Sequence, residues 1–169
     1  MEIALLPNNS LKIKGKNATI LVDPKDKTEA NAALIFSGNS KEANTNNVEV
    51  VIDGPGEFET GGIKITGQRF EDEMLYSLSV DSVSILIGKS AVLEKAHQKL
   101  KEANILVVKC EEVSEASSLT SLVTNVVIFY GENASEMGKT FGQENVKHLS
   151  KYASTIDKLP AEVETIILE

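Results

Sequence analysis

The first half of the chain alternates apolar and polar residues with the period of two that is typical of β-strands. Residues 11–14 read Leu-Lys-Ile-Lys and residues 63–66 read Ile-Lys-Ile-Thr, so each segment has one apolar face. Turn-forming Gly, Asn, Asp and Pro residues separate such segments. The pattern predicts a first half that is nearly all β, with strands over residues 2–6, 11–14, 19–22, 33–36, 48–52, 63–66, 75–80 and 83–87.

The segment 54–67 has the densest turn signals of the chain. Gly54, Pro55 and Gly56 turn the chain after the predicted strand 48–52. Gly61 and Gly62 supply the positive φ angles that a two-residue hairpin turn requires. We therefore predict a hairpin whose second arm is the alternating strand 63–66.

In the second half the pattern changes to helices and unbroken apolar runs. Apolar positions from residue 93 to residue 103 recur at helical spacing behind Ser90, which is a suitable helix cap. Weaker helical patterns cover residues 112–122 and 134–141, and Gly142 would stop the second. The runs 105–108, 126–129, 146–149 and 162–168 predict strands, the first two buried on both faces. An all-β half followed by βα units predicts an α/β sandwich with mixed sheets, folded as one domain over residues 1–169.

Composition and charge exclude several classes of partner. The formal net charge is −8 and Arg69 is the only arginine, which argues against nucleic acid and against an anionic membrane surface. No apolar run reaches the length of a bilayer span, and the N-terminal segment lacks the basic start of a signal peptide. We therefore expect a cytoplasmic protein. Cys110 is the single cysteine, so an internal disulfide is impossible.

Four segments, in this order, resemble the metallo-β-lactamase fold, in particular its small bacterial and archaeal hydrolases similar to the ascorbate-phosphate lactonases. Residues 11–24 resemble the opening hairpin that ends in Asp-Pro, and residues 54–67 resemble a Pro-Gly-Glu-aromatic-Glu hairpin. Residues 104–108 resemble an Asp-Ile-Leu-Leu strand, and residues 157–168 resemble the usual C-terminal strand. The resemblance covers most of the chain. It implies an αββα-type sandwich of two mixed β-sheets with outer helices.

The same resemblance implies that the metal site of this family is lost. Family members bind one or two metal ions, mostly through a His-x-His-x-Asp-His loop, and the corresponding residues 37–44 contain neither His nor Asp. Lys89 falls near the position of the bridging Asp and Tyr130 near that of the final His, whereas Asp23 keeps a position that mainly orders the loops. We predict no catalytic residue, no metal ligand and no cofactor. The degenerate site would comprise Asp23, Ser37, Asn39, Ser40, Glu42, Lys89 and Tyr130.

The remaining candidate groups do not replace the lost ligands. His97 lies on the apolar face of a predicted helix and His148 in a late strand, so both are interpreted as packed or surface residues because a metal site needs several convergent ligands. Cys110 precedes two glutamates, and these would raise the pKa of a thiol rather than lower it. Neither histidine nor the thiol predicts an active site.

A second candidate site consists of carboxylates around the hairpin 54–67. Glu57 and Glu59 are two residues apart, so on a strand their side chains share one face, and Asp53 is close in sequence. Paired carboxylates can act as acid and base. The interpretation that weighs more is a turn whose carboxylates cap backbone amides.

These observations support two hypotheses about function. The first is a non-catalytic pseudoenzyme, free of metal, that acts through binding or self-assembly as a homo-oligomer or with a protein partner. The alternative is a hydrolase of the same superfamily whose active site has diverged or moved, built from Asp23, Asp53, Glu57 and Glu59. Whether the protein is an enzyme stays open at this point, with the first hypothesis preferred. Neither hypothesis involves nucleic acid or a membrane.

Overall fold

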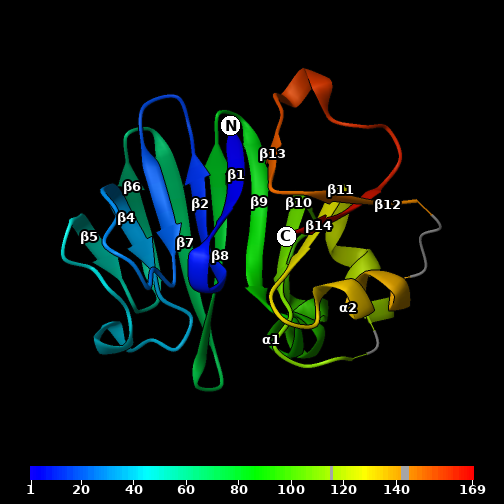
Figure 1. Cartoon of the computed structure of the whole chain (residues 1–169), viewed down its shortest axis with the longest axis horizontal. Coiled ribbons are helices and arrows are strands. Elements are labelled where there is room, and N and C mark those ends of the chain that lie inside the picture. Colours follow the sequence, from blue (N-terminus) through cyan, green and yellow to red (C-terminus); the bar gives the residue numbers. More distant parts are fainter. Residues whose placement is uncertain (115, 142–144) are drawn as a thin grey trace.

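The computed structural model describes residues 1–114, 116–141 and 145–169, and its strands form two mixed β-sheets (Figure 1). Sheet A has six strands in the order β13 (Lys151–Ala153), β1 (Glu2–Leu6), β2 (Ser10–Lys14), β3 (Thr19–Val22), β4 (Ala30–Leu34) and β5 (Val48–Ile52). Sheet B has eight strands in the order β12 (Val146–Leu149), β14 (Glu164–Leu168), β11 (Val123–Tyr130), β10 (Ala103–Lys109), β9 (Val83–Lys89), β8 (Glu73–Val80), β7 (Ile63–Phe70) and β6 (Gly56–Thr60).

The chain crosses between the sheets three times, after β5, before β13 and again between β13 and β14. After β5 it leaves sheet A, and β6 to β9 build the antiparallel half of sheet B. The parallel strands β10, β11, β14 and β12 complete that sheet. Near its end the chain returns to sheet A, where β13 pairs antiparallel with β1 so that Tyr152 lies opposite Ile3. Most predicted strands are present, but β4 covers Ala30–Leu34 rather than residues 33–36, and β13 was not predicted. The pattern also did not indicate to which sheet each strand belongs.

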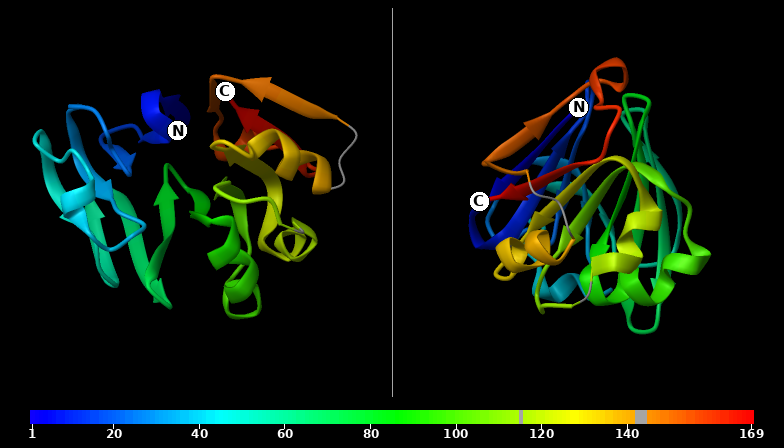
Figure 2. Two further views of the ribbon diagram at one scale, coloured as in Figure 1. Left: turned by 60° about the horizontal axis from the view of Figure 1, so that its bottom comes forward. Right: turned by 90° about the vertical axis from the view of Figure 1, so that its right-hand side faces the viewer.

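Both α-helices pack on sheet B (Figure 2). Helix α1 (Ser90–Ala96) contacts β8, β9 and β10, and α2 (Ala134–Thr140) contacts β11 and β14. Short 3-10 turns are η1 (Pro7–Asn9), η2 (Ser40–Glu42), η3 (His97–Lys99), η4 (Ala116–Leu122) and η5 (Ile156–Lys158). In the described ranges, no helix has the length and apolar character needed to cross a bilayer.

The two longer predicted helices are shorter or of another type. The helix expected up to residue 103 ends at residue 96, because β10 already begins at Ala103 and the chain must reach its register beside β9. The segment expected as a helix over residues 112–122 forms the 3-10 turn η4 from Ala116 onward, and Glu115 lies outside the described residues. The predicted stop at Gly142 also lies outside them.

Most of the apolar core lies between the two sheets. Ile13 and Ile20 of sheet A and Ile85, Val107 and Ile128 of sheet B are fully or almost fully buried there. A second layer, which includes Leu93, Leu106 and Phe129, fills the space between sheet B and the helices. Strands β10 and β11 are therefore covered on both faces, which confirms the interpretation of their unbroken apolar runs.

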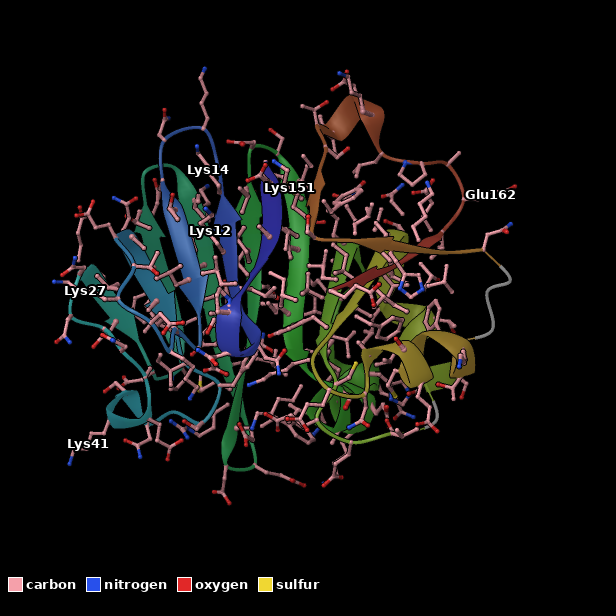
Figure 3. All side chains as sticks on the ribbon, viewed as in Figure 1. Lys12, Lys14, Lys27, Lys41, Lys151 and Glu162 are labelled. Carbon is pink, nitrogen blue, oxygen red and sulfur yellow. The ribbon has the colours of Figure 1, made fainter. Side chains whose placement is uncertain are left out.

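The predicted sandwich of two mixed sheets is confirmed, and its α-helical layer covers sheet B. The outer face of sheet A carries a small apolar cluster of Leu21, Ala33 and Ile35 under the loop that follows β4. Figure 3 shows Lys12, Lys14 and Lys151, which come from the strands on either side of β1. A charged face of this kind needs no covering layer.

The predicted Gly-rich hairpin is present, with Gly61 and Gly62 at φ angles of 54° and 81°. A Cβ atom on Gly61 would lie 2.5 Å from the Cβ atom of Ala18 and 3.0 Å from the carbonyl oxygen of Asn17. A Cβ atom on Gly62 would meet no atom within 4 Å. Of the two turn glycines, Gly61 and not Gly62 therefore lies in close contact with the turn between β2 and β3 of sheet A.

This difference gives a matched pair of variants. Both Gly61→Ala and Gly62→Ala place a side chain at positive φ, at a cost of about 1–2 kcal/mol. We expect Gly61→Ala to lower the free energy of unfolding by about 1–3 kcal/mol more, because it also overpacks the contact with Ala18. Denaturant unfolding of both variants measures the difference, and equal losses would contradict the close packing of these two turns.

Candidate functional site

Three neighbouring parallel strands of sheet B end with side chains directed between the two sheets. Lys89 ends β9, Lys109 ends β10 and Tyr130 ends β11, and the strand registers place Lys89 beside Lys109 and Lys109 beside Tyr130. Residues two positions earlier, Ile87 and Val107, belong to the core between the sheets. The carboxyl ends of adjacent parallel strands thus bring two ammonium groups and a phenol to the rim of the core.

Lys109 joins this rim to sheet A. Its Nζ lies 3.0 Å from Oδ2 of Asp23, and both side chains are only about one-eighth exposed, at 13% and 12%. The same ammonium lies 5.9 Å from the centre of the Phe36 ring. Removal of one partner from a pair this well buried strongly destabilises the folded protein, because the other charge then stays buried without compensation.

Glu111 connects the two lysines. Its Oε1 lies 3.1 Å from Nζ of Lys109, and its Oε2 lies 3.1 Å from Nζ of Lys89. Lys89 also lies 2.8 Å from Oε1 of Glu73. Five side chains therefore form one continuous ion-pair chain, in the order Asp23, Lys109, Glu111, Lys89 and Glu73, with alternating sign.

The pKa values of two members respond to this arrangement. Burial of Glu111 raises the pKa of its carboxyl, but the charges and hydrogen bonds of Lys109 and Lys89 outweigh burial, so this pKa lies below its ordinary value. Burial of Lys89 lowers the pKa of its ammonium, but Glu73 and Glu111 outweigh burial and hold this pKa above its ordinary value. Both shifts favour the charged forms of Glu111 and Lys89 at neutral pH.

Asp23 is held by three hydrogen bonds besides its ion pair with Lys109. Its φ angle of 43° lies in the left-handed region, which Asp tolerates better than most residues. Its amide donates to the carbonyl of Leu34 at 2.9 Å, and its carbonyl accepts from Oγ of Ser10 at 2.8 Å. Its Oδ1 accepts from the amide of Phe36 at 3.0 Å. These bonds, with the Oδ2 contact to Lys109, make Asp23 the anchor of the loop after β4.

The degenerate site predicted from the sequence is brought together in part. A cavity of about 110 Å³ is lined by four of its seven residues, Asp23, Ser37, Glu42 and Lys89, and also by Lys25, Ile35, Ala43, Lys109 and Glu111. Asn39 and Ser40 are not among the lining residues, although the side-chain amide of Asn39, just before η2, donates to Oε1 of Glu42 at 3.1 Å. Lys25, Lys109 and Glu111 are the charged lining residues that sequence reasoning missed, and Glu73 joins the site only through its ion pair with Lys89.

Tyr130, the seventh predicted residue, is fully buried in the core, and its hydroxyl has no hydrogen-bond partner among the described residues. Burial raises its pKa well above the ordinary value, and the nearby charges of Asp23 and Glu111 add to this effect. Tyr76 provides a contrast in the same core. Its hydroxyl lies 2.9 Å from the carbonyl oxygens of both Ile35 and Ile52. The hydroxyl of Tyr76 therefore ties the two sheets together, whereas the hydroxyl of Tyr130 does not.

The second candidate site does not assemble. Glu57 and Glu59 are exposed on β6, opposite Thr66 and Lys64 of β7. Asp53 lies in the bend before them, where Arg69 approaches its carbonyl oxygen at 3.5 Å rather than its carboxylate. Asp23, by contrast, is engaged by Lys109. The four carboxylates of the alternative hypothesis therefore do not converge on one cavity.

The two histidines and the thiol lie outside the cavity. His97 contacts the carbonyl oxygen of Glu94 at the end of α1, and His148 pairs with Glu169 on the surface. Cys110 is fully buried, and burial raises the pKa of its thiol to about 12. The direction of this shift was expected from the sequence, but its first cause is burial rather than the adjacent glutamates.

The donor set does not fit a catalytic metal. A first-row metal at neutral pH needs imidazole, thiolate or several convergent carboxylates, and across residues 1–114, 116–141 and 145–169 no three His, Cys, Asp or Glu side chains form such a group. Two ammonium groups occupy the space between the carboxylates of the cavity. Their charge opposes any cation there.

Comparisons with known proteins identify the fold. No family model matches the sequence, and no curated protein matches it. A solved structure from Thermotoga maritima, inferred to be a Zn-dependent hydrolase of the metallo-β-lactamase superfamily, matches with a TM-score of 0.71 and 15% identity over 99% of both chains. A second, inferred to be a metal-dependent hydrolase from Parabacteroides distasonis, matches with a TM-score of 0.60 and 11% identity over 97% of this chain and 91% of the other. The chain therefore has the metallo-β-lactamase fold that its sequence resembles.

The two buried tyrosines provide a test of the polar contacts around the site. Tyr76→Phe removes a buried hydroxyl from the carbonyl oxygens of Ile35 and Ile52, which then keep only the backbone amides of Gly38 and Ile35 as donors. We therefore expect it to lower the free energy of unfolding by about 0.5–1.5 kcal/mol. Tyr130→Phe removes a hydroxyl that has no partner, so we expect no loss, or a gain of up to about 1 kcal/mol. Urea unfolding measures both changes. A loss in Tyr130→Phe equal to that in Tyr76→Phe would show that the Tyr130 hydroxyl is bonded.

The ion-pair chain predicts how stability depends on pH. Because the folded pKa of Glu111 lies below its ordinary value of 4.5, its stabilising contribution is present above that pH and is lost as the pH falls through the folded pKa. Because the folded pKa of Lys89 lies above 10.5, its contribution is present below that pH and is lost as the pH rises further. We expect urea midpoints of the wild type to fall between about pH 6 and about pH 3, and to fall less steeply in Glu111→Gln.

Glu112→Gln is the matched control for this measurement, because Glu112 is the exposed neighbour of Glu111 and the substitution removes the same charge. We expect its acid profile to follow the wild type. If the urea midpoints of Glu111→Gln and the wild type fell in parallel as the pH is lowered, this would contradict a stabilising role of Glu111 in the ion-pair chain.

Proposed function

We propose that this protein is a non-catalytic member of the metallo-β-lactamase superfamily that acts through binding or self-assembly. One observation carries the proposal. The cavity at the carboxyl ends of β9 and β10 is occupied by Lys89 and Lys109, and each ammonium is paired with two carboxylates. Hydrolases of this fold need a metal-activated water, and in the described part of the chain no three possible ligand side chains gather into a group that could hold the metal.

The same residues are poor catalysts without a metal. A general base works best when its pKa lies near the working pH, whereas the lysines lower the pKa of Glu111. The thiol of Cys110 is buried, and its pKa of about 12 keeps it protonated at neutral pH. The hydroxyl of Ser37 accepts a hydrogen bond from the amide of Asn39 at 3.3 Å. The cavity thus lacks an activated nucleophile of the usual kinds.

The alternative is a hydrolase with a relocated active site. The names of the two structural neighbours favour it, since both are inferred hydrolases. The separation of Asp53, Glu57 and Glu59 from Asp23 weighs against the version built on these four carboxylates. We therefore place it second.

Self-assembly is the mode of action that the sheet edges support. Strands β5 and β6 are free edges of sheet A and sheet B and follow each other in the chain. Val50 on β5 is 45% exposed and Phe58 on β6 is 36% exposed. Free edges that lack Lys, Pro and bulges are templates for pairing with another chain, and β5 has none of these features. We propose that a second copy pairs with this edge.

Metal content and activity test the first part of the proposal. We expect protein purified without chelator to contain zinc, manganese or iron at well below one ion per chain, and no hydrolysis of phosphodiester, lactone or β-lactam substrates above buffer. Elemental analysis by mass spectrometry and substrate assays with added Zn²⁺ or Mn²⁺ measure this. Stoichiometric metal, or turnover that survives repurification, would refute the proposal.

A charge at the free edge tests the second part. We expect the wild type to sediment as a dimer or larger species, and Val50→Lys to sediment as a monomer, because a lysine on an edge strand opposes strand pairing. Val113→Lys is the control, since Val113 is 43% exposed but lies away from β5. Because Glu49, Glu57 and Glu59 lie on the same edge strands, association should strengthen with salt. A wild type that stays monomeric at all concentrations and salt levels would contradict self-assembly.

A further inference from the structure

Strand β6 leaves the edge of sheet B open along a strongly exposed segment. It is the last strand of the sheet, and among the described strands only β7 pairs with it. Four of its five residues, Gly56 to Glu59, are exposed, and Thr60 is half-buried. The backbone amide and carbonyl groups on its outer side can therefore receive a further strand.

The two faces of β6 differ in chemistry. Phe58 lies opposite Ile65, which belongs to the core between the sheets, so Phe58 points to that side although its own side chain is exposed. A Cβ atom on Gly56 would lie 3.2 Å from Cζ of the Phe58 ring, so the ring lies along the strand over Gly56. Glu57 and Glu59 point to the other face. A strand that joins β6 would meet carboxylates on one face and an aromatic ring on the other.

The residues around β6 do not neutralise its two carboxylates. Neither Glu57 nor Glu59 takes part in an ion pair within the part of the chain that the structure describes, although Lys64 lies opposite Glu59. The sequence between Lys41 and Lys64 contains further carboxylates and no cation. Carboxylates that share one face of an open edge oppose an acidic strand and attract a basic one.

A second copy of the chain is a poor occupant of this edge. The β6 strand of a second copy would bring its own two glutamates against Glu57 and Glu59. The segments of this chain in which lysine alternates with apolar residues are 11–14 and 63–66. Both are already paired on two sides, β2 with β1 and β3, and β7 with β6 and β8. A segment of matching chemistry therefore has to come from another protein.

We propose that the free edge of β6 binds an extended segment of a partner protein in which basic residues alternate with apolar residues. The backbone of this segment continues sheet B beside β6. Residues two apart on a strand share one face, so its basic side chains lie beside Glu57 and Glu59 while an apolar side chain between them packs on Phe58. The site extends the proposed binding role and does not depend on self-pairing, which was assigned to β5.

Fluorescence anisotropy of a labelled Lys-Val-Lys-Val-Lys-Val-Lys peptide tests the proposal. We expect saturable binding to the wild type that weakens at least about threefold between about 50 mM and about 300 mM NaCl, because salt screens the attraction to Glu57 and Glu59. A peptide with Glu in place of Lys should bind at least about tenfold more weakly. Absence of saturable binding by the Lys-Val peptide would overturn the proposal.

A peptide with Pro in place of Val separates strand pairing from simple charge attraction. It keeps every lysine but lacks alternate backbone amides, so it cannot pair as a strand. We expect it to bind at least about tenfold more weakly than the Lys-Val peptide. Equal binding of the two peptides would show that the attraction does not use the sheet edge, and would overturn the proposal.

Matched variants assign the binding to β6. Glu57→Lys/Glu59→Lys should weaken binding at least about tenfold. Glu102→Lys/Glu162→Lys makes the same change of net charge at exposed residues before β10 and β14, and should weaken binding less than about threefold. Equal losses in both would assign the attraction to net charge and contradict the site. If circular dichroism shows that the reversed variant does not fold, Glu57→Gln/Glu59→Gln replaces it, with an expected loss of about fivefold.

Hydrogen exchange followed by mass spectrometry locates the contact. Peptide binding should slow exchange in residues 56–60 at least about threefold, because the added strand shields amides that face away from β7, and should leave residues 48–52 unchanged. Protection of residues 48–52 instead would place the peptide on β5 and overturn the proposal. Protection of residues 56–60 that grows with protein concentration without peptide would assign the edge to a second copy, and would overturn it as well.

The result is separable from that of the proposed function. Metal content and turnover test the loss of catalysis, and sedimentation tests pairing at β5, whereas this inference is judged on the peptide alone. The two kinds of association also respond to salt in opposite directions, since self-pairing brings like charges together and peptide binding brings opposite charges together.

Discussion

Alternating charges at one end of the sandwich fix how the two sheets meet. The carboxylate of Asp23 accepts from the amide of Phe36 and pairs with Lys109, so one side chain positions the loop after β4 against β10. The amide of Met74 donates to the carbonyl of Phe36, and the Tyr76 hydroxyl reaches the carbonyl of Ile35, so β8 holds the same loop. Apolar burial drives the sheets together, but these directional contacts determine their position at the cavity.

The elements of the fold follow from local patterns, whereas its assembly depends on contacts that no short segment reveals. Alternation at residues 11–14 and 63–66 and the glycines at 61 and 62 were enough to predict strands and a hairpin. The helix over residues 93–103 was predicted too long, because the register of β10 beside β9 overrides helical periodicity at Ala103. The return of residues 151–153 to sheet A had no signal in the sequence, since three residues carry almost no periodicity.

The site was predicted in part for the same reason. Asp23 and Lys89 were found through the resemblance, and both line the cavity. Lys109 and Glu111 were missed, because a Lys and a Glu after an apolar run are typical of any strand that ends at the surface. The sequence did contain a signal, but it appears only when the ends of different strands are compared. Lys89 and Lys109 both end apolar runs, and once parallel pairing in register is assumed, two lysines side by side require an acidic partner. The two similar solved structures share this fold at identities of only 15% and 11%, so most of their side chains differ from those of this chain.

The pairing of β13 with β1 has a consequence for biosynthesis. Strand β1 leaves the ribosome well before residues 151–153, which form one of its two neighbours. Until those residues emerge, β1 is an edge strand with a free row of backbone amides and carbonyls, which other nascent chains can pair with. Sheet A can therefore be completed only late in translation, and truncated products that end before residue 151 would carry an open edge that favours capture by chaperones or aggregation.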